Sequence, residues 1–418
     1  MNIELIAIGD EVLYGMVVNS NAAFISQALF EAGFVVSRHS TVGDDPVALR
    51  KALHAALLRK SCVITTGGLG PTCDDHTRAA IAEIFNVPLK HNSEVHAYIK
   101  SIFGNTKCID NQATVPAGAE ILSNPLGTAS GLYLKNETLY PDSFLIALPG
   151  VPSEMKEMVK TELIPYLKAK LPSGKRLFVL PLHFMKLCEV DVDHHLHEIE
   201  KEFPEIRCGI YPGMGVLSVH LKAMAQDEEE FLEIVKTAQE KLSEKFRAHL
   251  FDSPSGRLDE AVHLYLLEKK LSLALAESCT GGSLAGRFCA YSGASSYFKG
   301  SIVAYANEVK KTLLHVSEKT LESKGAVSIE VTEEMAKNVA KEMGAECAVA
   351  VSGILGPAGG TTDKPIGTIC ASIYFEGMPV HSWQMKFTGN REIILEKTIQ
   401  NIFAELLTFL RKHIINQG

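Results

Sequence analysis

A chain of 418 residues exceeds the usual size of one domain, so two or three domains are expected. Its 46% hydrophobic and 22% charged residues are typical of a globular protein, and a formal net charge of −8 argues against a general nucleic-acid binder. Nine cysteines without CxxC pairs favour reduced thiols over a disulfide framework or a structural zinc site. Without a basic signal segment or an apolar run of membrane-spanning length, we expect a cytoplasmic protein whose partners include neither nucleic acid nor membrane.

The first 171 residues alternate strand-like and helix-like patterns. Ile3–Ile8 is a nearly continuous apolar run, typical of a strand buried on both faces. Strands are also predicted at 33–36, 62–66 and 143–148, and the helical period of 3.6 appears at 21–32, 46–59 and 75–85. Such alternation predicts a parallel sheet with helices on both faces, that is, a three-layer α/β domain.

The pattern changes between the turn-rich segments 171–174 and 252–256. Strands at 177–184 and 215–223, together with two amphipathic helices, predict a small α+β module. The remainder returns to the α/β pattern and closes on a helix over 391–413. We therefore expect three domains, covering residues 1–171, 172–254 and 255–418.

The segment Glu277-Ser-Cys-Thr-Gly-Gly282 ends an apolar strand of the C-terminal domain. Glycines at a strand-to-helix turn let the backbone approach a ligand, and the helix N-terminus offers N–H groups to an oxyanion. A hydroxyl or thiol at such a turn, Ser278 or Cys279, is placed for nucleophilic attack if a base lies near. No histidine falls in these motifs, so the candidate base is Lys310, with its pKa lowered by burial. A Gly-Gly turn after a strand is also often a purely structural turn without a catalytic role.

The C-terminal part of the chain closely resembles the C-terminal domain of the CinA family, the competence/damage-inducible proteins. The resemblance rests on six motifs in the family's order: Ala276–Gly282, Val303–Lys310, Gly325–Ser328, Val351–Pro357, Lys364–Thr368 and Thr388–Arg391. It implies a nicotinamide mononucleotide deamidase that needs no cofactor. The products would be nicotinic acid mononucleotide and ammonia.

The resemblance also implies roles for particular residues. Ser278 would be the acyl-forming nucleophile, Lys310 its base and Tyr305 a supporting catalytic residue. Cys279 remains the rival nucleophile, since a thiol beside a helix N-terminus can be activated. The turn Thr280-Gly281-Gly282 would hold the oxyanion and the substrate. Three further residues would complete the substrate site, with the arginine on the phosphate or ribose: Ser295, Ser352 and Arg391. The family usually has threonine at the position of Ser352, so the hydroxyl is kept.

The N-terminal domain carries glycine-rich and acidic strand ends in Ile8–Gly15, Thr65–Asp75 and Leu148–Glu154. They resemble the molybdopterin-binding fold found in the other half of the same family. The turn formed by Gly67, Gly68, Gly70 and Thr72 could cradle a phosphate. Three carboxylates at strand ends, Asp10, Asp74 and Asp75, could hold Mg²⁺ or a similar divalent ion, although Asp74 or Asp75 could equally cap the helix that follows.

Family resemblance implies metal-dependent hydrolysis of ADP-ribose by this domain, alongside deamidation in pyridine-nucleotide salvage. Two alternatives remain: a molybdopterin-handling protein and a competence or recombination adaptor. The expected partners are small nucleotides, and a homodimer is the expected assembly.

Overall fold

The structure is a computed structural model that describes residues 2–104, 109–170 and 174–414. The chain divides into two compact units, Met1–Phe178 with Met224–Phe231, and Val179–Ala223 with Leu232–Gly418. The second unit thus includes most of the predicted middle module. The predicted boundary between residues 171 and 172 lies outside the described residues, and the threefold division remains a prediction.

The N-terminal unit is built on a six-stranded sheet in the order β2-β1-β3-β8-β7-β6. The first four strands run parallel, and β7 and β6 are antiparallel additions at one edge that the alternating pattern did not reveal. The strands are β1 Asn2–Ile8, β2 Val36–Val42, β3 Ser61–Thr66, β6 Glu120–Leu122, β7 Gly131–Lys135 and β8 Phe144–Leu148, with a separate pair β4 Leu89–His91 and β5 Thr114–Pro116.

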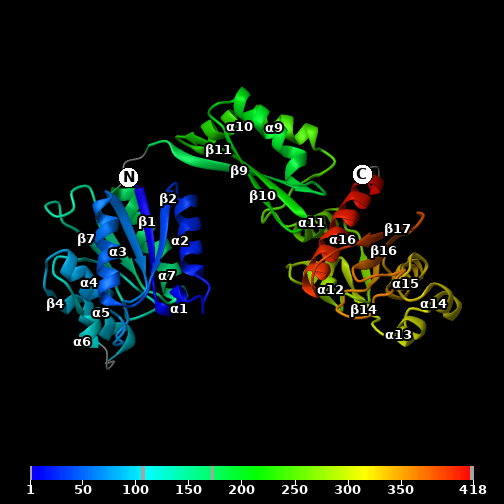
Figure 1. The fold of residues 1–418 in the computed structure, drawn as a ribbon, viewed down its shortest axis with the longest axis horizontal. Helices are drawn as coiled ribbons and strands as arrows, with labels where there is room; N and C mark the ends of the chain where they lie inside the picture. Colours follow the sequence, from blue (N-terminus) through cyan, green and yellow to red (C-terminus); the bar gives the residue numbers. More distant parts are fainter. Residues whose placement is uncertain (1, 105–108, 171–173, 415–418) are drawn as a thin grey trace. The chain divides into compact units, whose positions relative to one another are not determined.

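Helices cover both faces of this sheet, as predicted for a three-layer domain, and α2 and α3 lie on opposite sides of β1 (Figure 1). The alternation within β1 explains this, because Ile6 and Ile8 enter one core while Ile3 and Leu5 enter the other. The helices are α1 Asp10–Leu13, α2 Ser20–Glu31, α3 Pro46–Leu58, α4 Thr77–Ile84, α5 Ser93–Phe103, α6 Ile109–Gln112, α7 Pro152–Met158, a π-helical turn Val159–Leu163, and α8 Ile164–Lys170.

The second strand begins later than predicted. The N–H groups of Gly33 and Phe34 donate to Phe30 and Leu29 at the end of α2, so this segment closes the helix. The strand then runs through the polar residues 37–41, which are exposed because β2 is an edge strand. Apolar alternation, the signal used for prediction, is therefore missing.

The middle segment forms a four-stranded sheet in the order β10-β11-β9-β12, with two helices. Its elements are β9 Arg176–Met185, α9 Glu189–Glu202, β10 Arg207–Pro212, β11 Val216–Ala225, α10 Glu228–Lys245 and β12 Leu250–Phe251. Met185 and Phe251 belong to the same hydrophobic core as the C-terminal helices. Lys186 Nζ lies 2.9 Å from a carboxylate oxygen of Glu405, which adds an ion pair to this packing.

The C-terminal part carries a five-stranded sheet in the order β14-β13-β15-β16-β17. The first three strands are parallel and the last two antiparallel. Leu273 and Leu275 of β13 enter the core on one face, and Ala274 and Ala276 enter the other. The strands are β13 Leu273–Glu277, β14 Phe298–Val303, β15 Cys347–Gly353, β16 Thr368–Phe375 and β17 His381–Lys386.

Helices again cover both faces. They are α11 Leu258–Lys269, α12 Ser283–Cys289, a 3₁₀ turn Ala294–Ser296, α13 Asn307–Thr312, α14 Glu318–Lys324, α15 Ile329–Met343 and α16 Arg391–Ile414. In the described ranges, no helix combines the length and the apolar character needed to cross a bilayer. The mixed α/β class predicted from the sequence is confirmed.

Candidate active site

The carboxyl ends of β14, β13 and β15 meet at one edge of the sheet. Ser278, Tyr305 and Ser352 lie at or just beyond these three strand ends. The chain leaves β13 for β14 on one side and reaches β15 on the other, which makes the end of β13 a topological switch point. Because β17 ends at the same edge, it brings the start of α16, with Arg391, to the same place.

A buried carboxylate shapes the turn that follows β13. Glu277 is fully buried, and its two oxygens accept hydrogen bonds from the N–H groups of Gly282 at 3.0 Å, Leu284 at 3.1 Å and Ala285 at 2.9 Å. The Ser301 hydroxyl donates a fourth bond at 3.1 Å. This carboxylate therefore satisfies free donors at the start of α12 and fixes the turn that carries Ser278. This role of Glu277 was not predicted from the sequence.

Ser278 and Lys310 are in contact. The Lys310 Nζ lies 3.1 Å from the Ser278 Oγ, 2.8 Å from the Ala304 carbonyl and 3.3 Å from the Tyr305 carbonyl. All three neighbouring oxygens are uncharged. A neutral amine has two N–H groups and one lone pair, so it can donate to both carbonyls while accepting the serine hydroxyl proton.

Burial favours that neutral form. Lys310 is only 1% exposed, and its desolvation lowers the pKa of the ammonium below the ordinary value of 10.5. The geometry therefore brings together the predicted nucleophile and a base whose proton affinity is reduced, as nucleophilic catalysis requires.

The rival nucleophile is placed less favourably. Cys279 is buried, and desolvation raises the pKa of its thiol to about 12. Since the thiolate is the reactive form, such a thiol is a poor nucleophile at neutral pH. Its sulfur lies against Gly353, where an added Cβ would be 3.1 Å away, so Cys279 behaves as a packing residue.

The predicted oxyanion donors need a correction. The Gly282 N–H already donates to Glu277, and the Gly281 N–H donates to the Ser278 carbonyl at 3.2 Å. Both glycines have positive φ, so they shape the turn instead of presenting free donors. Within the described residues, no backbone hydrogen bond uses the N–H of Cys279 or Thr280, and the buried Thr280 hydroxyl has no partner either. These groups are the better candidates.

A cavity of about 210 Å³ opens beside the pair. Tyr305 is exposed, and its hydroxyl contacts the Arg391 guanidinium at 3.3 Å, whereas its backbone carbonyl contacts Lys310. Arg391 also donates to the Gly356 carbonyl at 2.9 Å, so neither partner neutralises its charge. The side chain of Tyr305, predicted to support catalysis, therefore contacts Arg391 and not Lys310. The lining comprises Ser278, Cys279, Tyr305, Asn307, Lys310, Ala326, Val327, Ser352, Gly353, Leu355 and Arg391.

Of the two serines predicted to bind substrate, one lines the cavity and the other does not. Ser352 lines the cavity, and its hydroxyl donates to the Ala326 carbonyl at 2.7 Å. Ser295 is not brought to the cavity. It precedes β14, and because β14 runs parallel to β13, Ser295 lies at the opposite edge of the sheet from Ser278. Ser295 lies between the motifs in the sequence, but it comes before its strand, whereas the other site residues come at or after the ends of theirs.

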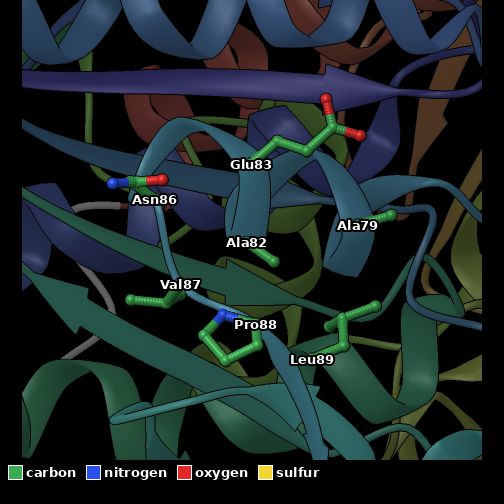
Figure 2. A pocket seen from close by; sticks show the side chains of 7 residues that line it. All are labelled: Ala79, Ala82, Glu83, Asn86, Val87, Pro88 and Leu89. Carbon is green, nitrogen blue, oxygen red and sulfur yellow. The ribbon is translucent and has the colours of Figure 1, made fainter.

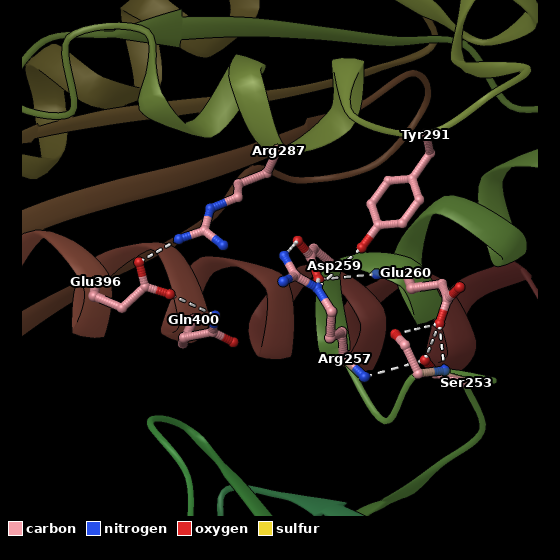
Figure 3. Close-up of polar contacts among 9 residues, drawn as sticks. Ser253, Arg257, Asp259, Glu260, Arg287, Tyr291, Glu396 and Gln400 are labelled. Atoms are coloured by element: carbon pink, nitrogen blue, oxygen red, sulfur yellow. Dashed lines mark hydrogen bonds and ion pairs between the residues drawn. The ribbon is translucent and has the colours of Figure 1, made fainter. Parts of the chain in front are cut away.

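Polar contacts link helices of the C-terminal part of the chain (Figure 3). Arg287 of α12 pairs with Glu396 of α16, which links the helix after the Ser278 turn to the helix that begins with Arg391. At the start of α11, Arg257 pairs with the buried Asp259. Ser253 donates to Glu260 at 2.6 Å and anchors the segment that enters this helix.

The glycine-rich loop of the N-terminal unit is a tight turn. Gly67 and Gly68 have positive φ, and a side chain at either position would collide, with the Ile8 carbonyl or the Thr77 hydroxyl respectively. The carboxylate of Asp75 accepts from the N–H of Gly70 at 2.8 Å and from that of Thr72 at 2.9 Å. The loop's own carboxylate therefore occupies two of the N–H groups predicted to cradle phosphate.

The predicted metal set Asp10, Asp74 and Asp75 is not brought together in the described residues. Asp75 is bound to its own loop, and neither Asp74 nor Asp75 caps α4, whose N-cap is His76. Asp10 pairs instead with Asp44, each accepting from the other's N–H at 3.0 and 3.2 Å. Burial raises the pKa of the Asp44 carboxyl, as do the nearby charges of Asp10, Glu11 and Asp74.

A cavity of about 330 Å³ lies between the glycine-rich loop and residues 149–154. Asp75 and Glu154 both line it, and so does Gln112, whose buried Nε2 has no partner within the described part of the chain. The buried Arg78 donates to the Gly70 carbonyl at 3.1 Å and to Gln112 Oε1 at 2.8 Å, and so fixes the loop. Arg78, Gln112 and Glu154 were missed because their positions depend on contacts remote in sequence.

A wider hollow of about 570 Å³ lies beside α4 and β4 in the same unit (Figure 2). Its lining in the described residues is mainly apolar, with the carboxylate of Glu83 as its only ionisable group. That carboxylate pairs with Arg50 at 3.1 Å, so the described lining offers no unpaired base.

Two protein-family models match the chain. Residues 4–169 match a probable molybdopterin binding domain, and residues 256–410 match the CinA C-terminal domain. Relatives can be aligned with nearly the whole length of this chain. A CinA-like protein of Prochlorococcus marinus (strain MIT 9215) is 36% identical over 407 residues, covering 95% of this chain and 94% of the relative. A putative competence-damage inducible protein of Clostridium botulinum (strain Loch Maree / Type A3) is 35% identical, covering 99% and 100%.

Solved structures match in part. A CinA superfamily protein from Klebsiella pneumoniae 700603 is 32% identical, covering 37% of this chain and 96% of its own, with a TM-score of 0.36. The CinA protein of Thermoplasma acidophilum, described as of unknown function, is 34% identical, covering 40% and 98%, also with a TM-score of 0.36.

Fold and sequence together define a protein that joins a molybdopterin-binding-like α/β domain to a second α/β domain with a serine–lysine pair at its sheet edge. The chain belongs to the CinA family.

Proposed function

We propose that the C-terminal domain is a serine amidase whose substrate is nicotinamide mononucleotide. The observation that carries the proposal is the contact between Ser278 and the buried Lys310. The Ser278 oxygen attacks the carboxamide carbon while neutral Lys310 takes the hydroxyl proton. The C–N bond then breaks, and that proton leaves with the amine as ammonia. Water hydrolyses the resulting ester, releasing nicotinic acid mononucleotide and restoring the serine.

The cavity supports a substrate with a small reacting end and a charged remainder. At about 210 Å³ it is smaller than the ~300–1,000 Å³ of most ligand sites, so the carboxamide ring enters while the ribose and phosphate remain at the mouth. Arg391 provides a positive charge there. The tetrahedral intermediate would accept from the N–H groups of Cys279 and Thr280.

Ammonia release from nicotinamide mononucleotide by the purified chain tests this function, and its pH dependence tests the base. Because only neutral Lys310 accepts the proton, kcat/KM should rise with pH and level off below 10.5, the ordinary lysine pKa. The same lowered pKa should make folding more stable as pH rises toward 10.5, since only the unfolded chain binds the proton in that window. A rate that is independent of pH below neutrality would contradict the role of Lys310.

We further propose that the N-terminal unit hydrolyses ADP-ribose with a divalent metal. The observation in favour is the cavity at the glycine-rich loop, whose described lining includes two carboxylates, Asp75 and Glu154, and no basic side chain. A pyrophosphate entering there needs a cation to offset the repulsion, and carboxylate oxygens suit Mg²⁺. Asp75 and Glu154 would hold the ion, which would polarise a phosphoryl oxygen.

ADP-ribose hydrolysis should therefore vanish with EDTA and return with added Mg²⁺. Asp75→Asn should raise the Mg²⁺ concentration needed for half-maximal rate by at least ~10-fold and leave deamidation unchanged. Asp142→Asn, an exposed carboxylate preceding β8, is the matched control and should change neither activity. Hydrolysis that persists in EDTA would contradict the metal role, and binding of molybdopterin without hydrolysis would favour a molybdopterin-handling protein.

A further inference from the structure

Two histidines and an aspartate meet on the N-terminal unit, and none of them lines either of the two cavities described there. His91 ends β4, His96 lies in the first turns of α5, and Asp110 lies in α6. Their ligand atoms all lie within 4.8 Å of one another, and among the described residues this is the only such group of His, Cys, Asp or Glu. Neither the family resemblance nor the proposed functions use these residues.

The local sequence explains why the histidines meet. Asn92 caps α5, accepting from the N–H groups of Glu94 and Val95 at 2.9 and 3.1 Å. His91 is then the residue before the cap and His96 the fourth residue of the helix, two positions that commonly hold an apolar pair in contact across a helix start. Here imidazoles occupy both positions, with ring centroids 5.4 Å apart.

Asp110 completes the group from a different helix. Its Oδ1 lies 3.6 Å from Nε2 of His96 and 3.9 Å from Nε2 of His91. Two protonated imidazoles this close would repel each other, whereas two neutral ones suit a single cation. Zinc bonds of 2.0–2.2 Å in a tetrahedron place ligand atoms about 3.4 Å apart. The two distances from Asp110 are close to that spacing, and all three ligand atoms lie within 4.8 Å of one another, so rotations of these partly exposed side chains would close the site.

We propose that His91, His96 and Asp110 form a binding site for a zinc-like divalent transition-metal ion. Imidazole nitrogens with one carboxylate favour zinc and its neighbours over Mg²⁺, which prefers oxygen. The group leaves a fourth tetrahedral position open to water. All three side chains are at least partly exposed, so the ion can enter.

The ion would join β4, α5 and α6. Among the described residues, these helices share a small hydrophobic cluster of Val95, Ile99, Ile109 and Ala113, distinct from the two main cores of the unit. A cluster of this size stabilises little by itself, and a metal bridge would add a link that the unfolded chain lacks. We therefore expect the ion to stabilise the fold. This effect is independent of the Mg²⁺ site proposed at Asp75.

The test is a calorimetric Zn²⁺ titration of the full chain with excess Mg²⁺ present and exposed thiols alkylated, because Cys73, Cys188 and Cys289 could also bind zinc. We expect one Zn²⁺ equivalent to be lost, or weakened at least ~10–100-fold, in His91→Gln, His96→Gln and Asp110→Asn. At a hundredfold excess over Kd, Zn²⁺ should raise the Tm of the unit by about 5–10 °C, and each variant should abolish that shift.

His194→Gln is the matched control. His194 and His195 both contact Glu198 on α9, at 3.3 and 3.1 Å, but their ligand atoms do not form a group of three within 4.8 Å in the described ranges. This variant should retain the full Zn²⁺ stoichiometry. Equal stoichiometry in the wild type and the three site variants, no binding by the wild type, or displacement of Zn²⁺ by Mg²⁺ would each overturn the proposal.

Discussion

Replacing Lys310 by methionine should lower the rate of deamidation by at least ~10²–10⁴-fold while leaving the domain folded. Methionine fills a similar volume without a proton-accepting nitrogen, so the Ser278 hydroxyl loses its base. Methionine also removes the unfavourable burial of an amine, which should offset the two lost bonds to the Ala304 and Tyr305 carbonyls. Ammonia assays combined with thermal unfolding should therefore show lost turnover with Tm nearly unchanged.

Lys311 is the matched control. It neighbours Lys310 on α13, but its ammonium is partly exposed and pairs with Glu308 and Glu318. Lys311→Met should leave kcat/KM within about twofold, since partly exposed ion pairs contribute little. A comparable loss of kcat/KM in the two variants would contradict the role of the buried Lys310 as the base.

Glu277→Gln should reduce both stability and activity. The carboxylate accepts four hydrogen bonds, but a glutamine amide has one acceptor oxygen and turns N–H donors toward groups that also donate. Two buried or partly buried donors then lose their partners, at a cost of about 2–4 kcal/mol in the free energy of unfolding. Because the same bonds shape the turn, Ser278 should also lose its alignment with Lys310, which kcat measures together with denaturant unfolding.

Glu346→Gln provides the comparison at the other end of β13. One oxygen of the exposed Glu346 accepts both the N–H and the hydroxyl of Ser272, and a glutamine oxygen can accept both as well. The free energy of unfolding should change by less than about 1 kcal/mol. An equally stable Glu277→Gln protein would show that the carboxylate does not shape the turn.

The sequence predicted the parallel cores of both sheets, because strands buried on two faces are continuous apolar runs. It missed the strands β6, β7, β16 and β17, which join their neighbours in antiparallel pairs. The edge strands β6 and β17 are short or partly exposed, and buried runs such as β7 and β16 do not reveal the direction in which they pair. Lys310 was proposed as the base because no histidine falls in the motifs, and its contact with Ser278 became visible only in the structure. The family resemblance assigned the roles of nucleophile and base.

The remaining assignments failed for identifiable reasons. Ser295 follows a glycine turn as other site residues do, but it precedes its strand and so lies at the amino ends. Asp10 and Asp75 both follow strand ends, so they were expected at the same edge of the sheet. Their positions in the sequence could not show that Asp75 would accept hydrogen bonds from Gly70 and Thr72 instead of facing Asp10. Glu277 stands next to the nucleophile, but its partners become donors only once α12 has formed.

Ammonia release by Ser278→Ala and Cys279→Ala, assayed side by side with nicotinamide mononucleotide, tests the central claim most directly. Ser278 is within reach of the base, whereas burial raises the pKa of the Cys279 thiol to about 12. We predict that Ser278→Ala loses activity by several orders of magnitude yet still binds substrate in a titration, and that Cys279→Ala retains most of its turnover. An active Ser278→Ala protein beside an inactive Cys279→Ala protein would contradict the serine mechanism and identify a thiol amidase.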